Sequence, residues 1–322
     1  MAVSMLELFR TLTSFTPPRT DLRDAPWDDF VPWAMGQGLA SLAAYNLEYR
    51  LGSAGSPEWV RHRLLSLYQG MANDNVMKLV NLKRCIDDLE GRKIVLVGGV
   101  SFAESIYPHV AFRPVIDVRL LVPPSDVEPL TTWLRRSEFK AEAGLVDRAG
   151  AVKVLSDTRT QLFLHGGFFS DKAENEALMA RTLPMKPFGP SARRLDAEDA
   201  LLVHVLLMAR VGFEVPMLEF LDLRELCVGA PSMGGVYSRQ LDASVIASRA
   251  KAWKIERALW VALSVVEKLW PDAAAAVARL KPDVSFPVRE VLERLVVNPL
   301  SSVGRTEGIK GEDVLRSLLT GE

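Results

Sequence analysis

Two short runs of aliphatic and β-branched residues lie between long stretches that have the hydrophobic period of an α-helix. The first run is Lys93–Val97, closed by Gly98-Gly99, and the second is Ile116–Val122, closed by Pro123-Pro124. Runs of this length that end at Gly or Pro predict buried β-strands. A sheet embedded between helical stretches predicts an α+β protein, with a small sheet flanked by N-terminal and C-terminal helical regions.

The residues before the first strand predict helices. Apolar residues between Trp59 and Leu89 recur at the i, i+3, i+4, i+7 spacing of one buried helix face, and Asn and Asp residues at positions 73–75 are expected to kink or divide this helix. A shorter helix is predicted at Trp33–Leu51. After the sheet, Asp196 is predicted to cap a helix, and Ser244–Trp270 repeats apolar residues, including three Trp, at helical spacing.

The central segment has further elements. A short helix is predicted at Phe102–Tyr107, and Ser125 is expected to cap a helix over Asp126–Ser137. Ala151–Leu155 and Thr160–Leu164 are predicted to pair as a hairpin. The order β-α-β-α-β-β suggests three regions: N-terminal helices (1–90), a sheet domain (91–190) and C-terminal helices (191–322).

Composition excludes several classes of protein. The chain of 322 residues has 39 Lys+Arg against 40 Asp+Glu, a net charge of −1, so no nucleic-acid partner is indicated. The apolar run Ala200–Ala209 is far shorter than the roughly 20 residues that a membrane helix needs. Without a recognisable signal peptide, and with only Cys85 and Cys227 as thiols, the sequence predicts a cytoplasmic protein without a membrane partner.

The histidines and cysteines lack the spacing of a structural zinc site. His165 is a candidate base, although a lone histidine at a strand end is more often part of the structure, and His204 is expected in the core of an apolar helix. Gly98-Gly99-Val100-Ser101 follows a strand and precedes a helix, so its N–H groups are placed to contact a phosphate. The alternative is that this glycine pair forms only a turn.

A series of short motifs gives the sequence a family resemblance. In order, they are Gly98-Gly99, Tyr107-Pro108, Arg113-Pro114, Asp117-Val118-Arg119, Leu121-Val122, Leu164-His165, the helix opening at Leu195–His204, and Phe220-Leu221-Asp222-Leu223. The chain resembles the uncharacterised nucleotidyltransferase family of the DNA polymerase β superfamily, from about residue 30 to 270. The resemblance implies a small mixed nucleotidyltransferase-like sheet.

The resemblance also implies a pattern of acids that is incomplete here. The family carries Asp-x-Asp on a strand and a third acid on a neighbouring strand, which hold two Mg²⁺ ions and a nucleoside triphosphate. This chain keeps Asp117, has Arg119 at the second position, has no carboxylate in Thr160–His165, and has Gly98 where the family usually has Lys. An Arg beside one carboxylate makes a poor Mg²⁺ site, because the guanidinium is always charged.

The sequence therefore predicts a catalytically impaired pseudoenzyme that binds a nucleotide, another anionic small molecule or a protein partner. The alternative is an active transferase that uses Mg²⁺ and a nucleoside triphosphate. Asp117 is the remaining candidate for catalysis or metal binding; the candidate phosphate-binding residues are Gly98, Gly99, Ser101, Arg113, Arg119 and His165. Asp117 and Arg119 are expected to pair on one face of the strand, with Arg119 in the place of a catalytic Mg²⁺. The alternative is that Arg119 is simply a stabilising partner of Asp117 and binds no ligand.

Overall fold

The computed structural model describes residues 3–14, 16–89, 91–136, 139–140, 151–156, 161–229, 240–295 and 319. Within these residues, the strands form one seven-stranded sheet in the order β3-β4-β5-β2-β1-β7-β6. The strands are β1 (Ile94–Val97), β2 (Asp117–Leu121), β3 (Phe139–Lys140), β4 (Val152–Ser156), β5 (Gln161–His165), β6 (Leu183–Pro184) and β7 (Ala192–Arg194). The sheet is mixed, because β1 runs antiparallel to β2 and parallel to β7. The predicted α+β class is confirmed.

The strand predictions hold, with small shifts at their ends. β4 and β5 pair antiparallel as the expected hairpin, although residues 157–160 of its turn lie outside the described residues. β7 lies beyond residue 190 and still pairs with β1, so the sheet extends past the region first assigned to it.

The short helix after β1 begins earlier than expected. It is α5 (Gly99–Ser105), which follows directly on Gly98, whose φ of 62° turns the chain sharply out of the strand. The next helix, α6 (Pro124–Arg136), begins at Pro124, so the prediction that Ser125 caps it from outside is wrong. Proline suits a first helical position, because its fixed φ is already helical and it has no N–H to leave unpaired.

The long helix predicted before the sheet is confirmed as α4 (Glu58–Asp87), and it is not divided. The expected interruption at 73–75 is wrong. Asn75 is fully buried, and its side chain bonds outside the helix: the amide donates to the carbonyls of Val110 and Arg113 and accepts the N–H of Val115. Its polar groups therefore support the loop before β2 and do not compete with the helix backbone.

The N-terminal helices are α1 (Met5–Thr13), α2 (Trp27–Gly36), α3 (Ala40–Tyr45) and the π-helical turn η1 (Asn46–Arg50). The single helix predicted at Trp33–Leu51 is wrong, because Gly38 has a φ of +73° and separates α2 from α3. A Cβ at Gly38 would lie 3.0 Å from Leu218 Cδ2, so the break is fixed by close packing against a distant part of the chain.

The remaining helical elements are η2 (Val110–Phe112), α7 (Lys172–Ala180), η3 (Lys186–Phe188), α8 (Ala197–Arg210), α9 (Met217–Val228), α10 (Ala243–Ala252), α11 (Glu256–Leu269), η4 (Pro271–Ala273), α12 (Ala274–Leu280) and α13 (Phe286–Leu295). The predicted cap of α8 is confirmed, since Asp196 accepts the N–H of Asp199. The stretch Ser244–Trp270 forms α10 and α11, separated at Lys254, where φ is +58°. Its three tryptophans are buried, as expected.

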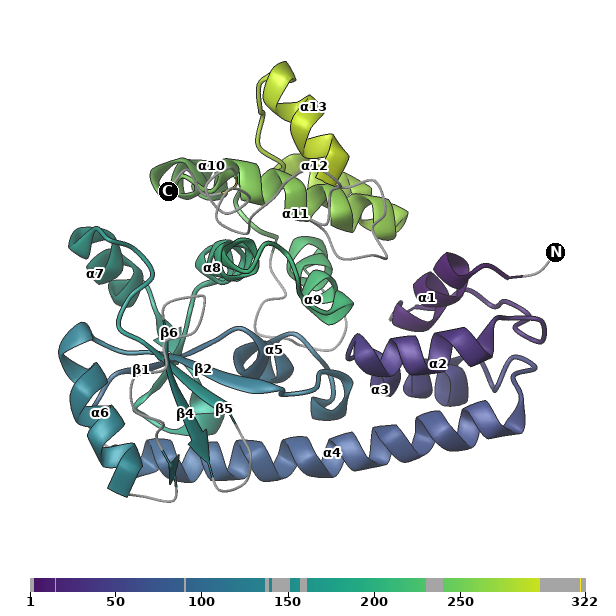
Figure 1. Cartoon of the computed structure of the whole chain (residues 1–322), viewed down its shortest axis with the longest axis horizontal. Helices are drawn as coiled ribbons and strands as arrows, with labels where there is room; N and C mark the ends of the chain where they lie inside the picture. Colours follow the sequence, from purple (N-terminus) through teal and green to yellow (C-terminus); the bar gives the residue numbers. More distant parts are fainter. Residues whose placement is uncertain are drawn as a thin grey trace.

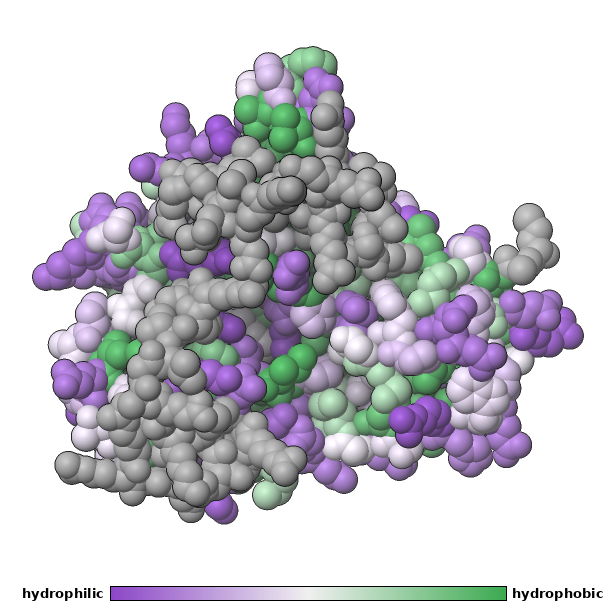
Figure 2. Space-filling model, in the orientation of Figure 1, coloured by the Kyte–Doolittle hydropathy of each residue, from purple (hydrophilic) through white to green (hydrophobic). Residues whose placement is uncertain are grey.

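The helices lie around the sheet in a defined order (Figure 1). α4 runs along the base, beneath both the N-terminal helices and the sheet, while α8 and α9 lie between the sheet and α10–α13. One hydrophobic cluster joins the N-terminal helices to α8, α9 and α11, and a second joins the sheet to α6 and the C-terminal half of α4. Apolar surface is also visible over α13 (Figure 2), where Phe286 is exposed. No described helix has both the length and the apolar character needed to cross a membrane.

Candidate functional site

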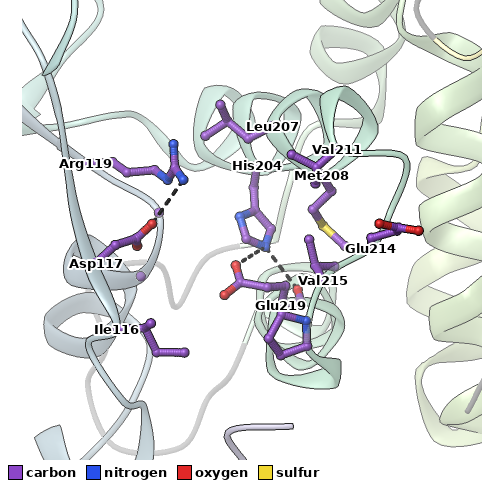
Figure 3. A pocket seen from close by; sticks show the side chains of 13 residues that line it. Ile116, Asp117, Arg119, His204, Leu207, Met208, Val211, Glu214, Val215 and Glu219 are labelled. Carbon is purple, nitrogen blue, oxygen red and sulfur yellow. Dashed lines mark hydrogen bonds and ion pairs between the residues drawn. The ribbon is translucent and has the colours of Figure 1, made fainter. Parts of the chain in front are cut away.

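A pocket of about 350 Å³ lies between the sheet and the α8–α9 pair (Figure 3). On the sheet side it is lined by Gly98, Gly99, Ile116, Asp117 and Arg119; on the helix side it is lined by His204, Leu207, Met208, Val211, Glu214, Val215, Pro216 and Glu219. Because β1 and β2 are antiparallel, the end of β1 lies beside the start of β2, and this brings the glycine pair to Asp117. The pocket therefore has a polar side on the sheet and a largely apolar wall on the helices.

Asp117 and Arg119 form the expected pair on one face of β2. Arg119 Nη2 lies 3.0 Å from Asp117 Oδ2, and its guanidinium carbon lies 4.4 Å from the centre of the Phe163 ring. The same guanidinium contacts His165 Nε2 at 3.4 Å. Arg119 is thus held by a carboxylate, an aromatic face and an imidazole.

The neighbouring strand supplies no carboxylate at this place. In the parallel pairing of β2 and β5, Gln161 lies opposite Asp117 and Phe163 lies opposite Arg119. A Mg²⁺ ion needs several oxygen ligands in near-octahedral geometry. One carboxylate that is already paired with a guanidinium does not fit such an ion.

The environment of Asp117 disfavours its charged form. Burial raises the pKa of Asp117, the nearby Arg119 charge acts in the opposite direction, and the Glu219 charge raises it further. Glu219 belongs to α9, so this carboxylate comes from the opposite wall of the pocket.

Arg113 lies behind the pocket and does not line it. Its side chain is only 2% exposed; Nε and Nη2 donate to Asp222 Oδ2, Nη2 also donates to Glu219 Oε1, and Nη1 donates to the Pro114 carbonyl. Tyr107 donates its hydroxyl to the same Asp222. The Tyr-Pro, Arg-Pro and Leu-Asp motifs of the sequence therefore meet in one buried network, and Arg113, predicted to bind phosphate, belongs to this network and not to the pocket lining.

Gly99 is required by this network. A Cβ at Gly99 would lie 2.1 Å from Arg113 Nη1, so the guanidinium packs directly on the bare backbone. Gly99 thus leaves the space that the buried Arg113 side chain occupies, and it also lines the pocket.

A group of three potential metal ligands lies at the same place. Among the described residues, His204, Glu219 and Asp222 have ligand atoms within 4.8 Å of one another. However, Arg113 Nη2 lies 2.8 Å from a carboxylate oxygen of Glu219 and from one of Asp222. The positive charge between these two acids is therefore the guanidinium of Arg113.

Of the residues predicted from the sequence, Gly98, Gly99, Asp117 and Arg119 line the pocket, whereas Ser101, Arg113 and His165 are buried outside its lining. The helices α8 and α9 form one wall of the pocket, and β5 contributes Phe163 and His165, which contact Arg119. Glu219 and the apolar wall were not expected. His204 was expected in the core, and it is 3% exposed while lining the pocket.

A family model described as "Uncharacterised nucleotidyltransferase" matches residues 23–271. A search of curated proteins found no significant match, and neither did a search of solved structures.

Proposed function

The chain belongs to the uncharacterised nucleotidyltransferase family, and from this premise we propose that it is a catalytically impaired member that binds a nucleotide without transferring it. The observation that carries the proposal is the Asp117–Arg119 ion pair at 3.0 Å. Nucleotidyl transfer by this superfamily depends on metal ions that clamp the phosphates and activate the attacking hydroxyl. A guanidinium in place of one carboxylate opposes a metal ion and attracts a phosphate directly.

The pocket suits a ligand of this size and mixed character. Its volume of about 350 Å³ falls within the range of small-molecule sites. The proposed nucleotide places a phosphate oxygen at Arg119 and the flat aromatic face of its base against Leu207, Met208 and Val211. Such binding is expected to need no metal ion and to weaken as salt rises.

The first experiment measures transfer. The protein is incubated with labelled ATP, GTP, CTP or UTP, together with Mg²⁺ or Mn²⁺ and candidate acceptors. We expect no label on any acceptor. Robust labelling that Asp117→Asn abolishes would refute the proposed loss of catalysis.

The second experiment measures nucleotide binding by equilibrium titration, in EDTA and in Mg²⁺. Wild type is expected to bind equally in both, whereas Arg119→Asp places two acids side by side and makes any remaining binding depend on Mg²⁺. Arg92→Gln is the matched control, because Arg92 pairs with Asp126 outside the pocket. Wild-type binding that requires Mg²⁺ would contradict a role of Arg119 in place of a metal. If no nucleotide binds in any condition, a protein partner becomes the favoured ligand.

One observation favours an active enzyme as the second candidate. Glu219 lines the same pocket from α9 and affects the pKa of Asp117, so it offers an acid that β5 lacks. If the first experiment gives transfer, this candidate predicts that Glu219→Gln abolishes the transfer as completely as Asp117→Asn.

A further inference from the structure

We propose that the end of the pocket formed by α9 is a subsite for a protonated amine, with Glu219 as the residue that recognises it. The inference rests on the proposed function in one respect, namely that this pocket is the ligand site. It adds a second chemical class to the phosphate proposed at Arg119, so that the pocket recognises opposite charges at its two ends.

The Glu219 carboxylate is fixed from behind by two buried side chains. Arg113 Nη2 donates to Oε1 at 2.8 Å, and His204 Nε2 lies 3.0 Å from the Glu219 main-chain oxygen and 3.5 Å from Oε2. Because a carbonyl oxygen only accepts, the close contact assigns the imidazole proton to Nε2. Glu219 itself remains 21% exposed, and its carboxylate points across the pocket toward Asp117 (Figure 3). The carboxylate is therefore held in place with acceptor capacity facing the pocket.

The charges on the pocket wall favour a cation at this end. The lining has three carboxylates, those of Asp117, Glu214 and Glu219, and one guanidinium, that of Arg119. Arg119 is paired with Asp117, and the charge of Arg113 is shared between Glu219 and the buried Asp222. Glu219 and Asp222 carry two negative charges against the one positive charge of Arg113, so a net negative charge remains in this cluster on α9, and a concave site concentrates such a field on its ligand.

The surroundings of Glu219 suit an ammonium group better than a metal ion. A divalent cation at Glu219 would lie beside the guanidinium of Arg113, and the lining carboxylate that faces Glu219, Asp117, is already paired with Arg119. Mg²⁺ and Ca²⁺ need six or more oxygen ligands. A single ammonium needs few acceptors, and its carbon body can pack on Val215 and Pro216. Ile116, which is 55% exposed, offers apolar surface on the opposite side of the pocket.

The experiment compares two probes of the same shape by NMR titration of the whole chain at low salt. Benzylamine carries the positive charge, and benzyl alcohol is its neutral counterpart. We expect benzylamine to bind about tenfold more tightly, which is the usual effect of a hydrogen bond to a charged group. Glu219→Gln, which keeps the size of the side chain, is expected to remove this preference.

Glu214→Gln is the matched control. Glu214 also lines the pocket and carries the same charge, but its side chain points away from His204 and Asp117 (Figure 3). We expect the control to keep most of the preference for benzylamine. An equal loss in both variants would show a general charge effect and would overturn the assignment to Glu219.

Two other results would overturn the inference. The first is equal binding of benzylamine and benzyl alcohol to wild type, a comparison that does not depend on how well any variant folds. The second is displacement of benzylamine by Mn²⁺ with loss of Mn²⁺ binding in Glu219→Gln, which would make this a metal site. Titration of wild type with ATP in EDTA separates the two proposals. Failure of ATP to bind would refute the proposed nucleotide binding and would leave the amine subsite standing. The amine subsite is refuted only by the results of the benzylamine titrations.

Discussion

Arg113 and Asp222 form a buried ion pair in which Nε and Nη2 of the arginine donate to the same carboxylate oxygen, at 3.1 and 2.8 Å. Arg113 lies just before β2, and Asp222 lies in the middle of α9. The pair therefore fastens the strand that carries Asp117 and Arg119 to the helix that carries Glu219. The two sides of the pocket are held in a fixed relation by this contact.

Loss of Arg113 should destabilise the protein strongly. Arg113→Met leaves Asp222 as a buried charge with only the Tyr107 hydroxyl from this network, and breaking such a pair from one side costs about 3–5 kcal/mol. Arg92→Met, which removes a surface pair with Asp126, should change the free energy of unfolding by less than about 1 kcal/mol. Urea denaturation of both variants tests the difference, and similar losses would argue against a central role for the buried pair.

Two glycine-to-alanine substitutions should have opposite effects. Gly99→Ala introduces a methyl group 2.1 Å from Arg113 Nη1, and overpacking of this kind costs about 1–3 kcal/mol. Gly70→Ala lies within α4 and meets no atom within 4 Å, so it should stabilise the protein by about 0.5–1 kcal/mol. Thermal melting tests both effects, since the melting temperature should fall in Gly99→Ala and rise in Gly70→Ala. An unchanged melting temperature in Gly99→Ala would mean that the Arg113 guanidinium can move aside at little cost.

Two of the asparagines of α4, Asn73 and Asn75, provide a similar contrast. Asn75→Ala removes the bonds to the carbonyls of Val110 and Arg113 and to the N–H of Val115, and leaves these groups without that partner, at a cost of about 2–4 kcal/mol. Asn73→Ala is on the exposed side of the same helix and should be nearly neutral or slightly stabilising. Chemical denaturation distinguishes them; equal stability of the two variants would contradict the role given to Asn75.

Stability should also depend on pH through Glu225. Burial raises the pKa of this carboxyl from 4.5 to about 7, although the neighbouring Arg224 acts in the opposite direction. The folded state therefore binds more protons than the unfolded state between these values, and the free energy of unfolding falls as pH rises through this window. One proton gives a slope of at most about 1.4 kcal/mol per pH unit.

The measurement for Glu225 is urea denaturation between pH 5 and 8, with wild type and Glu225→Gln in parallel. The variant cannot titrate at this position, so its stability should fall less over the window. Curves of equal slope would assign the pH dependence to other groups.

Local sequence signals predicted much of the sheet and its first helix. The runs at β1 and β2 are short, strongly apolar and closed by Gly or Pro, and the pairing of Asp117 with Arg119 follows from the two-residue period of a strand. The family motifs, taken in order, indicated the family that the comparison then matched. Each of these signals lies within a few neighbouring residues.

The parts that could not be predicted depend on contacts between distant residues. The break between α2 and α3 depends on the packing of Gly38 against Leu218. Arg193 and Arg194 have no strand pattern around them, yet β7 forms because β1 offers it a parallel partner. Glu219 was missed because the acids were expected on a strand of the sheet, whereas this one comes from α9, whose position depends on Arg113.

The pairing of β1 with β7 limits how the chain can be cut. β1 is a strand of four buried apolar residues, and its hydrogen bonds on one side are made only when residues 192–194 are present. A fragment that ends at residue 190 would expose this side as a free apolar strand edge, the kind of surface through which proteins aggregate. Expression of the sheet region alone would therefore give self-association, and β7 serves the whole molecule by covering the edge that β1 would otherwise expose.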